Sequence, residues 1–268
     1  MDVFFSCDIE GVAGVTSWAD AGEPAGPAYA AACAQMSRET AAACRGALAA
    51  GAGRILVKDA HDTGRNIDPA ALPEEAQLNR GFSGDIWCMM SGIQHGEWDA
   101  AGFLGYHSGA SLGGSPLSHT MSLGVDYLQL NGQRASEFVL NAYTAALFGV
   151  PVCFVSGDAA LCDQARRLIP AIACVPTSKG VGASATTLHP ALAASRIQEA
   201  VRLQLDSGAY RDCHLELPAH FDLYLRYKEE QPAYRAGFYP GAEQVEEKTI
   251  HYVSGNYEDI LRLLTFVL

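Results

Sequence analysis

The chain has 268 residues, and 49% of them are hydrophobic. A globular chain of this length buries roughly 75% of its unfolded surface, enough for one large domain or two small ones. With 18 Lys and Arg against 30 Asp and Glu, the formal net charge is -12. Nucleic acid and an anionic membrane surface are therefore poor partners, and a small ligand or a metal fits better.

The sequence also indicates where the protein works. It has no run of about 18 apolar residues, and no basic segment precedes its first apolar run, so we expect neither a membrane span nor an export signal. The eight cysteines are widely spaced, without a C-x-x-C pair. Such cysteines are typical of free thiols in a reducing compartment. We therefore expect a cytoplasmic protein.

Short β-rich runs alternate with longer helical runs, which predicts an α/β fold with a mainly parallel sheet covered by helices. Asn131-Gly132 is a strong hairpin signal, because both residues tolerate the positive φ angles of a type I′ turn. In the first half we expect, in chain order, a strand at 3–7, a helix at 28–50, strands at 54–59, 86–91 and 101–106, hairpin strands at 127–130 and 133–134, and a helix at 136–148.

The alternation continues in the second half. The expected elements are a strand at 152–156, a helix at 158–168, a strand at 171–175, a helix at 190–205, a strand at 213–217, a helix at 221–230, a strand at 249–253 and a helix at 257–267. A Gly/Ser-rich stretch at 179–184 is the only plausible hinge. We expect a metal-binding catalytic portion at 1–178 and a smaller α+β portion at 179–268 packed on it, with one compact domain as the alternative.

Two acidic residues, Asp8 and Glu10, follow the first predicted strand. Residues i and i+2 of an extended chain project to the same face, so both carboxylates leave the strand in one direction. Two like charges this close destabilise each other unless a proton or a cation lies between them. The pair predicts a metal site, although acidic residues are also common in turns that follow strands.

Further metal-binding side chains occur where other predicted elements begin or end. Asp59 and His61 follow the second strand, His107 ends the strand at 101–106, His119 follows a Gly/Ser-rich loop, and Glu137 opens a helix. Open α/β sheets bind ligands at the carboxyl edge of their strands, so we expect these donors to converge. Asp59 is either a turn residue or a carboxylate that orients His61.

The motifs that carry these residues resemble those of the DppA-type D-aminopeptidases, a family of dinuclear zinc peptidases. The resemblance is strongest over roughly the first 160 residues. The matching segments are Ser6-Cys7-Asp8-Ile9-Glu10-Gly11, Val57-Lys58-Asp59-Ala60-His61, Leu104-Gly105-Tyr106-His107, Leu117-Ser118-His119-Thr120-Met121, and Glu137 with Leu140-Asn141-Ala142-Tyr143.

The resemblance assigns roles to the six candidate residues. It implies that Asp8 bridges two Zn²⁺ ions, that His119 is catalytic, and that the other metal ligands are Glu10, His61, His107 and Glu137. Carboxylates and imidazoles suit zinc or a similar divalent ion, and the scattered cysteines exclude a thiolate site. Histidine gains and loses a proton near neutral pH, which favours proton transfer for His119, while a nucleophilic role stays open.

The resemblance also implies a substrate and an assembly. We expect an aminopeptidase that acts on short peptides with an N-terminal D-residue, such as D-Ala-D-Ala. The family resemblance further implies a ring-shaped homo-oligomer, a decamer.

Two other functions compete with this prediction. Gly109-Ala110-Ser111-Leu112-Gly113 matches the G-x-S-x-G elbow of serine hydrolases, with Ser111 as the nucleophile. An elbow needs a helix directly after the serine, and the Gly/Pro-rich residues that follow Ser111 are a poor helix start. The second alternative is a non-catalytic peptide-binding component of a transport system, which would bind peptides without turning them over.

Overall fold

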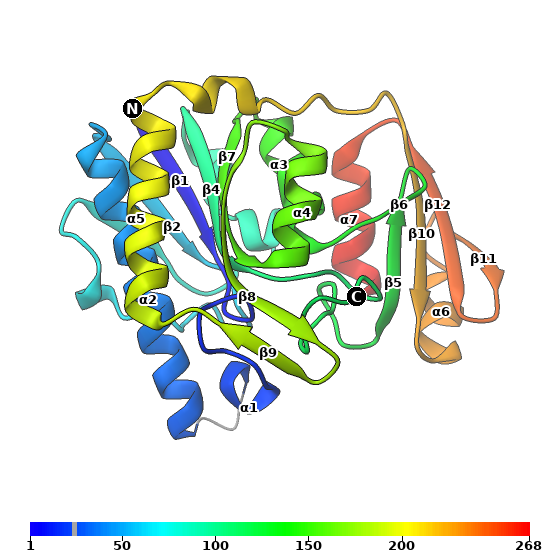
Figure 1. Ribbon diagram of the computed structural model, residues 1–268. Coiled ribbons are helices and arrows are strands. Elements are labelled where there is room, and N and C mark those ends of the chain that lie inside the picture. The colour runs from blue at the N-terminus through cyan, green and yellow to red at the C-terminus, as the bar shows by residue number, and fades with distance from the viewer. Residues whose placement is uncertain (23–25) are drawn as a thin grey trace.

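A seven-stranded sheet runs through the centre of the protein (Figure 1). The structure is a computed structural model and describes residues 1–22 and 26–268. The strand order is β3-β2-β1-β4-β7-β8-β9, and all neighbours are parallel except β8 and β9. The strands are β1 (Asp2–Cys7), β2 (Arg54–Asp59), β3 (Ala76–Asn79), β4 (Ala100–Tyr106), β7 (Val152–Asp158), β8 (Ala173–Val181) and β9 (Ser184–Thr187).

Helices cover both faces of this sheet, as a parallel sheet requires. Helix α2 (Pro27–Ala49) packs against α5 (Pro190–Asp206) on one face. Both begin with a proline at the first helical turn, where no backbone donor is lost. The other helices are α1 (Trp18–Ala21), α3 (Glu137–Leu147), α4 (Ala159–Leu168), α6 (Glu230–Ala236) and α7 (Tyr257–Val267), with short 3₁₀ turns at Pro69–Ala71, Cys88–Met90, Ile93–His95 and Ala209–Cys213.

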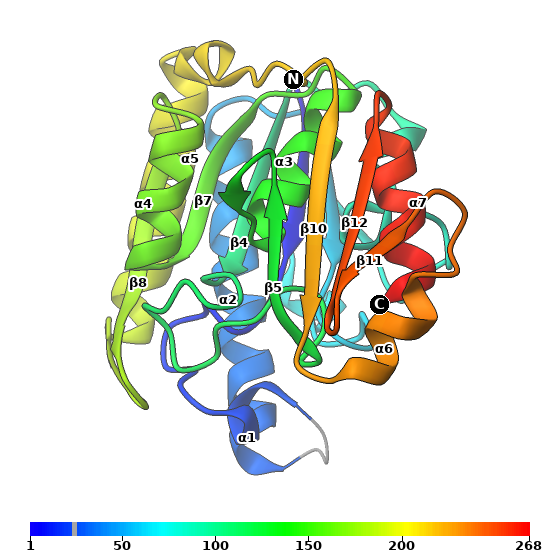
Figure 2. The same ribbon diagram turned by 90° about the vertical axis from the view of Figure 1, so that its right-hand side faces the viewer.

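A second, antiparallel sheet stands beside the first, with α3 and α7 between the two (Figures 1 and 2). Its strand order is β11-β12-β10-β5-β6. The strands are β5 (Val125–Leu130), β6 (Gln133–Arg134), β10 (Phe221–Tyr227), β11 (Glu243–Glu246) and β12 (Thr249–Ser254). The sheet therefore joins a hairpin from the middle of the chain to strands from its end.

The strand order of the central sheet reverses between β1 and β4. From β1 the chain crosses to β2 on one side, and from β4 it crosses to β7 on the other, so the carboxyl ends of β1 and β4 flank a topological switch point. The two ends lie very close: Asp8 N donates to Leu104 O at 2.8 Å, and Gly11 N donates to Gly105 O at 2.8 Å. Gly105 has a φ of 66°, and a Cβ at Gly11 would collide with the carbonyl oxygen of Tyr106.

The predicted fold class is confirmed, together with most of the predicted elements. The hairpin is also confirmed, with Asn131 and Gly132 at φ angles of 50° and 79°. The stretch 179–184 comprises the end of β8, the turn at 182–183 and the first residue of β9. The division at residue 178 stays a prediction.

Three predicted elements are wrong. Residues 86–91 do not form a strand: Cys88–Met90 is a 3₁₀ turn that buries Met89 and Met90, and the edge strand is β3. Cys213 ends a 3₁₀ turn, and residues 214–217 do not join a sheet. The segment predicted as a helix at 221–230 begins with strand β10, because its apolar side chains alternate with a period of two.

Within the described residues, no helix has the length and apolar character needed to cross a membrane. The eight cysteines are free thiols. This agrees with the interpretation of their spacing.

Candidate metal centre

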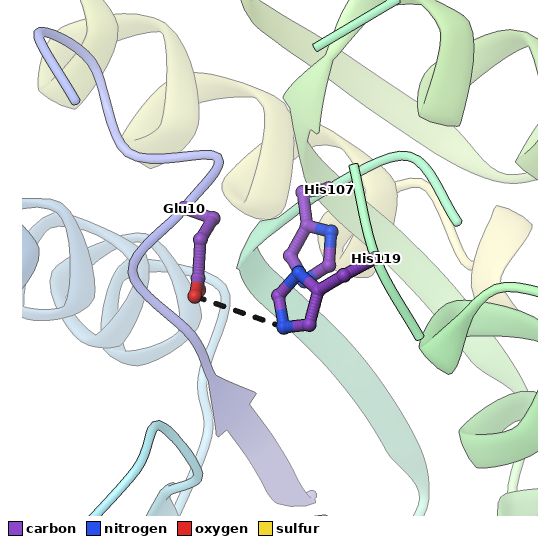
Figure 3. Close-up of side chains that lie close together, drawn as sticks. All are labelled: Glu10, His107 and His119. Atoms are coloured by element: carbon purple, nitrogen blue, oxygen red, sulfur yellow. Dashed lines mark ion pairs between the residues drawn. The ribbon is translucent and has the colours of Figure 1, made fainter. Parts of the chain in front are cut away.

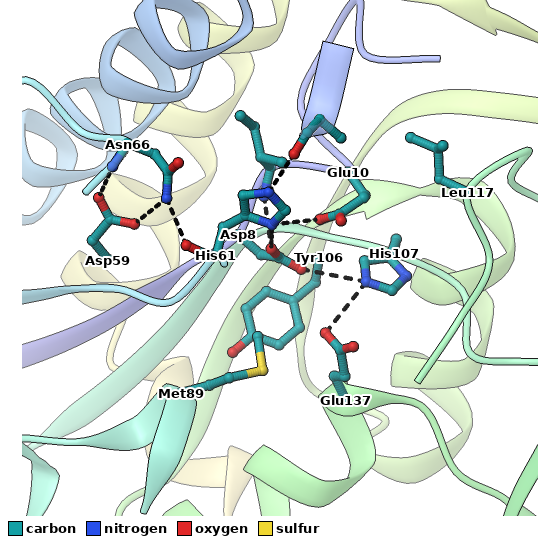
Figure 4. Close-up of polar contacts among 12 residues, drawn as sticks. Asp8, Glu10, Asp59, His61, Asn66, Met89, Tyr106, His107, Leu117 and Glu137 are labelled. Carbon is teal, nitrogen blue, oxygen red and sulfur yellow. Dashed lines mark hydrogen bonds and ion pairs between the residues drawn. The ribbon is translucent and has the colours of Figure 1, made fainter. Parts of the chain in front are cut away.

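The six candidate residues lie together at the carboxyl edge of the central sheet, five of them drawn in Figure 4 and His119 in Figure 3. They come from separate parts of the chain: Asp8 and Glu10 follow β1, His61 follows β2, His107 follows β4, His119 lies on the loop before β5, and Glu137 opens α3. All except His119 are buried, and the side chain of His119 is 13% exposed. The structure thus brings together all six residues that the sequence singled out.

Asp8 lies between two histidines, each of which also faces a second carboxylate. Asp8 Oδ1 lies 3.1 Å from His61 Nδ1, which is also 3.1 Å from Glu10 Oε2. Asp8 Oδ2 lies 3.4 Å from His107 Nε2, which is also 3.3 Å from Glu137 Oε2. Two groups of possible metal ligands therefore share Asp8, one with Glu10 and His61, the other with His107 and Glu137.

The remaining nitrogen of each histidine contacts a backbone carbonyl. His61 Nε2 lies 2.5 Å from Ala21 O, and His107 Nδ1 lies 3.0 Å from Ser108 O. In the tautomer that donates to these carbonyls, the nitrogen that faces the carboxylates carries a free lone pair. A histidine that binds a metal is commonly oriented in this way.

Burial and neighbouring charges shift the pKa values of Asp8, Glu10 and His61. Burial raises the pKa of Asp8, but the neighbouring His107 and His61 rings outweigh it and hold that pKa well below its usual range. Burial and the nearby Asp8 raise the pKa of Glu10. Burial lowers the pKa of His61, but Glu10 and Asp8 outweigh it and raise the pKa to about 11. The negative charges of these carboxylates thus stabilise a positively charged group in the site.

The donor set fits a divalent cation. Asp8 Oδ2, Glu10 Oε2 and His107 Nε2 are buried without a hydrogen-bond partner, and buried polar atoms are normally paired. All three point into the cluster, where a cation would satisfy them. Imidazole and carboxylate ligands are those that zinc takes in catalytic sites.

His119 differs from the other two histidines (Figure 3). Its ring stacks on His107 with centroids 4.3 Å apart, and Trp18 packs edge-on against it. Its Nδ1 lies 2.9 Å from Leu117 O, whereas its Nε2 lies 3.9 Å from Glu10 and 3.7 Å from Glu137. These distances are longer than those of His61 and His107, and the ring lines an open pocket.

Asp59 supports the site through the backbone. Its carboxylate accepts hydrogen bonds from Asn66 N at 2.6 Å, from Asn66 Nδ2 at 2.8 Å and from Ile67 N at 2.7 Å. Asn66 Nδ2 also donates to His61 O at 2.7 Å. Of the two interpretations of Asp59, the turn residue is therefore the one found, and Asp59 fixes the loop that carries His61.

The metal cluster opens into a pocket of about 620 Å³. Sequence reasoning did not single out six residues of its wall: Trp18, Asp62, Phe82, Cys88, Met121 and Leu123. These residues come from loops and from the short helix α1. Only Met121 lay within a motif, and the others gave no signal in a single sequence.

Ser111 does not form a nucleophile elbow. Its hydroxyl donates to Asp126 O at 2.7 Å, and the described residues 112–118 contain turns, bends and irregular backbone but no helix. The helix that an elbow requires directly after the serine is thus missing from this segment.

Comparison with known proteins agrees with the geometry. The model of peptidase family M55, described as D-aminopeptidase, matches residues 1–266. A D-aminopeptidase of Bacillus subtilis (strain 168) is 31% identical over 212 residues, which cover 77% of this chain and 74% of that protein.

A solved structure shows the same fold. It is the Zn-dependent D-aminopeptidase DppA from Bacillus subtilis, described as a self-compartmentalizing protease. The TM-score is 0.90 at 25% identity, with 100% of this chain and 96% of that chain covered.

The fold and the comparisons define an enzyme that hydrolyses peptides. The chain belongs to peptidase family M55, the D-aminopeptidases. The resemblance to DppA-type enzymes is thereby confirmed, and the two alternatives, a serine hydrolase and a transport component, are set aside.

Proposed function

We propose that this chain is a zinc-dependent aminopeptidase that holds two ions and releases an N-terminal D-residue from short peptides such as D-Ala-D-Ala. The observation that carries the proposal is the position of Asp8 between two groups of ligands. Glu10 and His61 would complete the first group, and His107 and Glu137 the second. The zinc-dependent DppA structure, with the same fold, supports this choice of metal.

The bound ions would supply the chemistry of a two-metal hydrolase, by lowering the pKa of a water molecule and polarising the peptide carbonyl. The chain's own residues prepare the site for this. The hydrogen bonds to Ala21 O and Ser108 O hold the rings of His61 and His107 with one free nitrogen toward the carboxylates. The backbone N–H of Met121 donates to Glu137 Oε1 at 2.6 Å and fixes that carboxylate.

His119 is the residue proposed to move protons. With Nδ1 held by Leu117 O, its Nε2 faces the pocket and the carboxylates of Glu10 and Glu137. There it can accept a proton from the attacking water and donate one to the departing amine. The edge of Trp18 keeps the ring in place.

Metal analysis tests the ligands. Elemental analysis of the purified protein should give two zinc ions per chain, and Asp8→Ala should lose both together with activity. EDTA should abolish hydrolysis and Zn²⁺ should restore it. A fully active protein without metal would refute the proposal.

Two histidine variants separate catalysis from metal binding. His119→Ala should keep the metal content of the wild type and lose activity by about 10²- to 10⁴-fold. The matched control is His95→Ala, because His95 is exposed and lies outside the cluster. His95→Ala should change neither the metal content nor the activity. Loss of metal from His119→Ala would contradict the catalytic role proposed for His119.

The stereochemical preference needs a direct assay. D-Ala-D-Ala and L-Ala-L-Ala should be compared at equal concentration, and the D-peptide should be cleaved faster. Equal rates, or faster cleavage of the L-peptide, would refute this part of the proposal.

We also propose a ring-shaped homo-oligomer, with a decamer as the family resemblance implies, that acts in the cytoplasm. The similar structure is described as self-compartmentalizing. On this chain, three aromatic side chains are largely exposed. Tyr234 of α6 is 59% exposed, Phe238 just after α6 is 73% exposed, and Phe266 of α7 is 70% exposed. Exposed aromatic clusters commonly mark protein interfaces. Light scattering should give a mass of ten chains, and a monomer at micromolar concentration would contradict it.

A further inference from the structure

A second cavity lies beside the metal pocket. It has a volume of about 300 Å³ and lies between the loop at 82–88, the loop after His119, α3 and α7. Its wall is mostly apolar, with Ile86, Trp87, Leu140, Leu261 and Leu264 among the residues that form it. Ligand sites in proteins are usually of this kind, apolar and concave with a few polar groups.

Three residues belong to the walls of both cavities: Phe82, Cys88 and Met121. Cys88 and Met121 have φ angles of 47° and 62°, in the left-handed region that side chains other than glycine rarely adopt. Such strain persists where the surrounding structure imposes it, and it is concentrated at functional sites. The hydrogen bond from Met121 N to Glu137 Oε1 connects this wall directly to a proposed metal ligand.

The charges of the walls indicate which end of a peptide lies here. Among the described residues, the lining of the two cavities contains Asp8, Glu10, Asp62, Asp85 and Glu137, but neither lysine nor arginine. A peptide carboxylate would find no lysine or arginine side chain in this wall, whereas an ammonium group is attracted to Asp62 and Asp85, which are not among the proposed metal ligands. The N-terminal residue of the substrate is therefore the one placed beside the second cavity.

We propose that the second cavity binds the side chain of the substrate's N-terminal residue and selects a bulky apolar one, such as leucine or phenylalanine. This inference rests on the proposed function, because it assumes an aminopeptidase. The cavity is roughly ten times the share of about 30 Å³ that one water molecule has in the liquid. The methyl group of alanine would leave most of it empty, and a larger apolar side chain fills it and buries more surface.

A substitution on the far wall tests the proposal. Thr265 lines the second cavity only, and it is exposed, so Thr265→Trp should reduce the cavity without disturbing the core. The matched control is Arg262→Trp, on the same helix, exposed and outside both linings. The substrates are the p-nitroanilides of D-leucine and D-alanine, which differ only in the N-terminal side chain.

The wild type should hydrolyse the leucine substrate with a kcat/KM at least tenfold above that of the alanine substrate. Thr265→Trp should lower kcat/KM for the leucine substrate by about 10- to 100-fold and leave the alanine substrate within about twofold. Arg262→Trp should change neither. A wild-type preference for alanine, or a Thr265→Trp effect equal for both substrates, would overturn the proposal.

A binding measurement keeps this test separate from the proposed function. Cys88 can be labelled with N-ethylmaleimide in the presence of D-leucinol or D-alaninol, which have no bond to hydrolyse. D-leucinol should slow labelling of Cys88 at least threefold more than D-alaninol, while Cys33, which lines neither cavity, reacts unchanged. Equal protection by the two compounds would overturn the proposal. If the wild type cleaves no peptide, the proposed function fails and this measurement alone decides.

Discussion

Glu39 offers a quantitative test of the structure outside the metal cluster. It lies on α2 and is 1% exposed. Its Oε1 accepts hydrogen bonds from Ala13 N at 3.1 Å and from Gln35 Nε2 at 2.9 Å, while its Oε2 is buried without a partner. Ala13 lies three residues after Glu10, so Glu39 supports the loop that carries the first acidic pair.

Burial raises the pKa of Glu39 from its ordinary value of 4.5 to about 7, and the hydrogen bonds from Gln35 and Ala13 offset only part of this effect. The folded state therefore binds the Glu39 proton more tightly than the unfolded state does. The contribution to the free energy of unfolding is complete below pH 4.5 and is lost as the pH rises to about 7. At 1.36 kcal/mol for each pKa unit, the loss is about 3 kcal/mol.

Glu39→Gln removes this titration and keeps an oxygen for Ala13 N. The free energy of unfolding of both proteins is measured in urea at pH 4.5 and at pH 8. We expect the free energy of unfolding of the variant, relative to that of the wild type, to rise by about 3 kcal/mol from the lower pH to the higher. The exposed Glu97→Gln is the control and should show no such change. A difference between Glu39→Gln and wild type that stays constant from pH 4.5 to pH 8 would refute the reasoning.

Three further predictions concern the site and its surroundings. Ser111→Ala should keep kcat/KM within about twofold of the wild type in a peptide hydrolysis assay, whereas a hundredfold loss would revive the serine mechanism. Asp59→Ala removes the acceptor that holds Asn66, so zinc affinity should fall by about 10- to 100-fold in a chelator competition; unchanged affinity would show that the loop does not depend on Asp59. Gly11→Ala places a methyl group against the carbonyl of Tyr106 and should lower Tm by about 6 °C or more, so an unchanged melting curve would contradict the close packing of β1 and β4.

The sequence predicted the site better than it predicted the second sheet. Asp8, His61 and His107 follow strands of the central sheet, and the carboxyl ends of parallel strands meet at one edge, so convergence could be expected from chain order alone. Trp18 gave no such signal, because it reaches the site through the three-dimensional path of a loop and a short helix.

The failures lie where periodicity is ambiguous or tertiary packing decides. Phe221–Tyr227 alternates buried and half-buried residues with a period of two, but its length and charged neighbours also suited a helix. The apolar run at 86–91 resembled a buried strand, yet it contains a 3₁₀ turn that buries its methionines by packing against α3. Both errors came from short segments that single-sequence patterns cannot distinguish.

The β5–β6 hairpin has a consequence for how the enzyme can be divided. Strand β5 pairs with β10 near the end of the chain, and Glu137 follows β6 by only three residues. A fragment that stops at residue 178 would contain all six candidate site residues but would leave β5 paired with β6 alone, without β10. We therefore expect the last third of the chain to support the segment that carries Glu137 without supplying a proposed ligand, so that a fragment of the six site residues and their strands alone would not work.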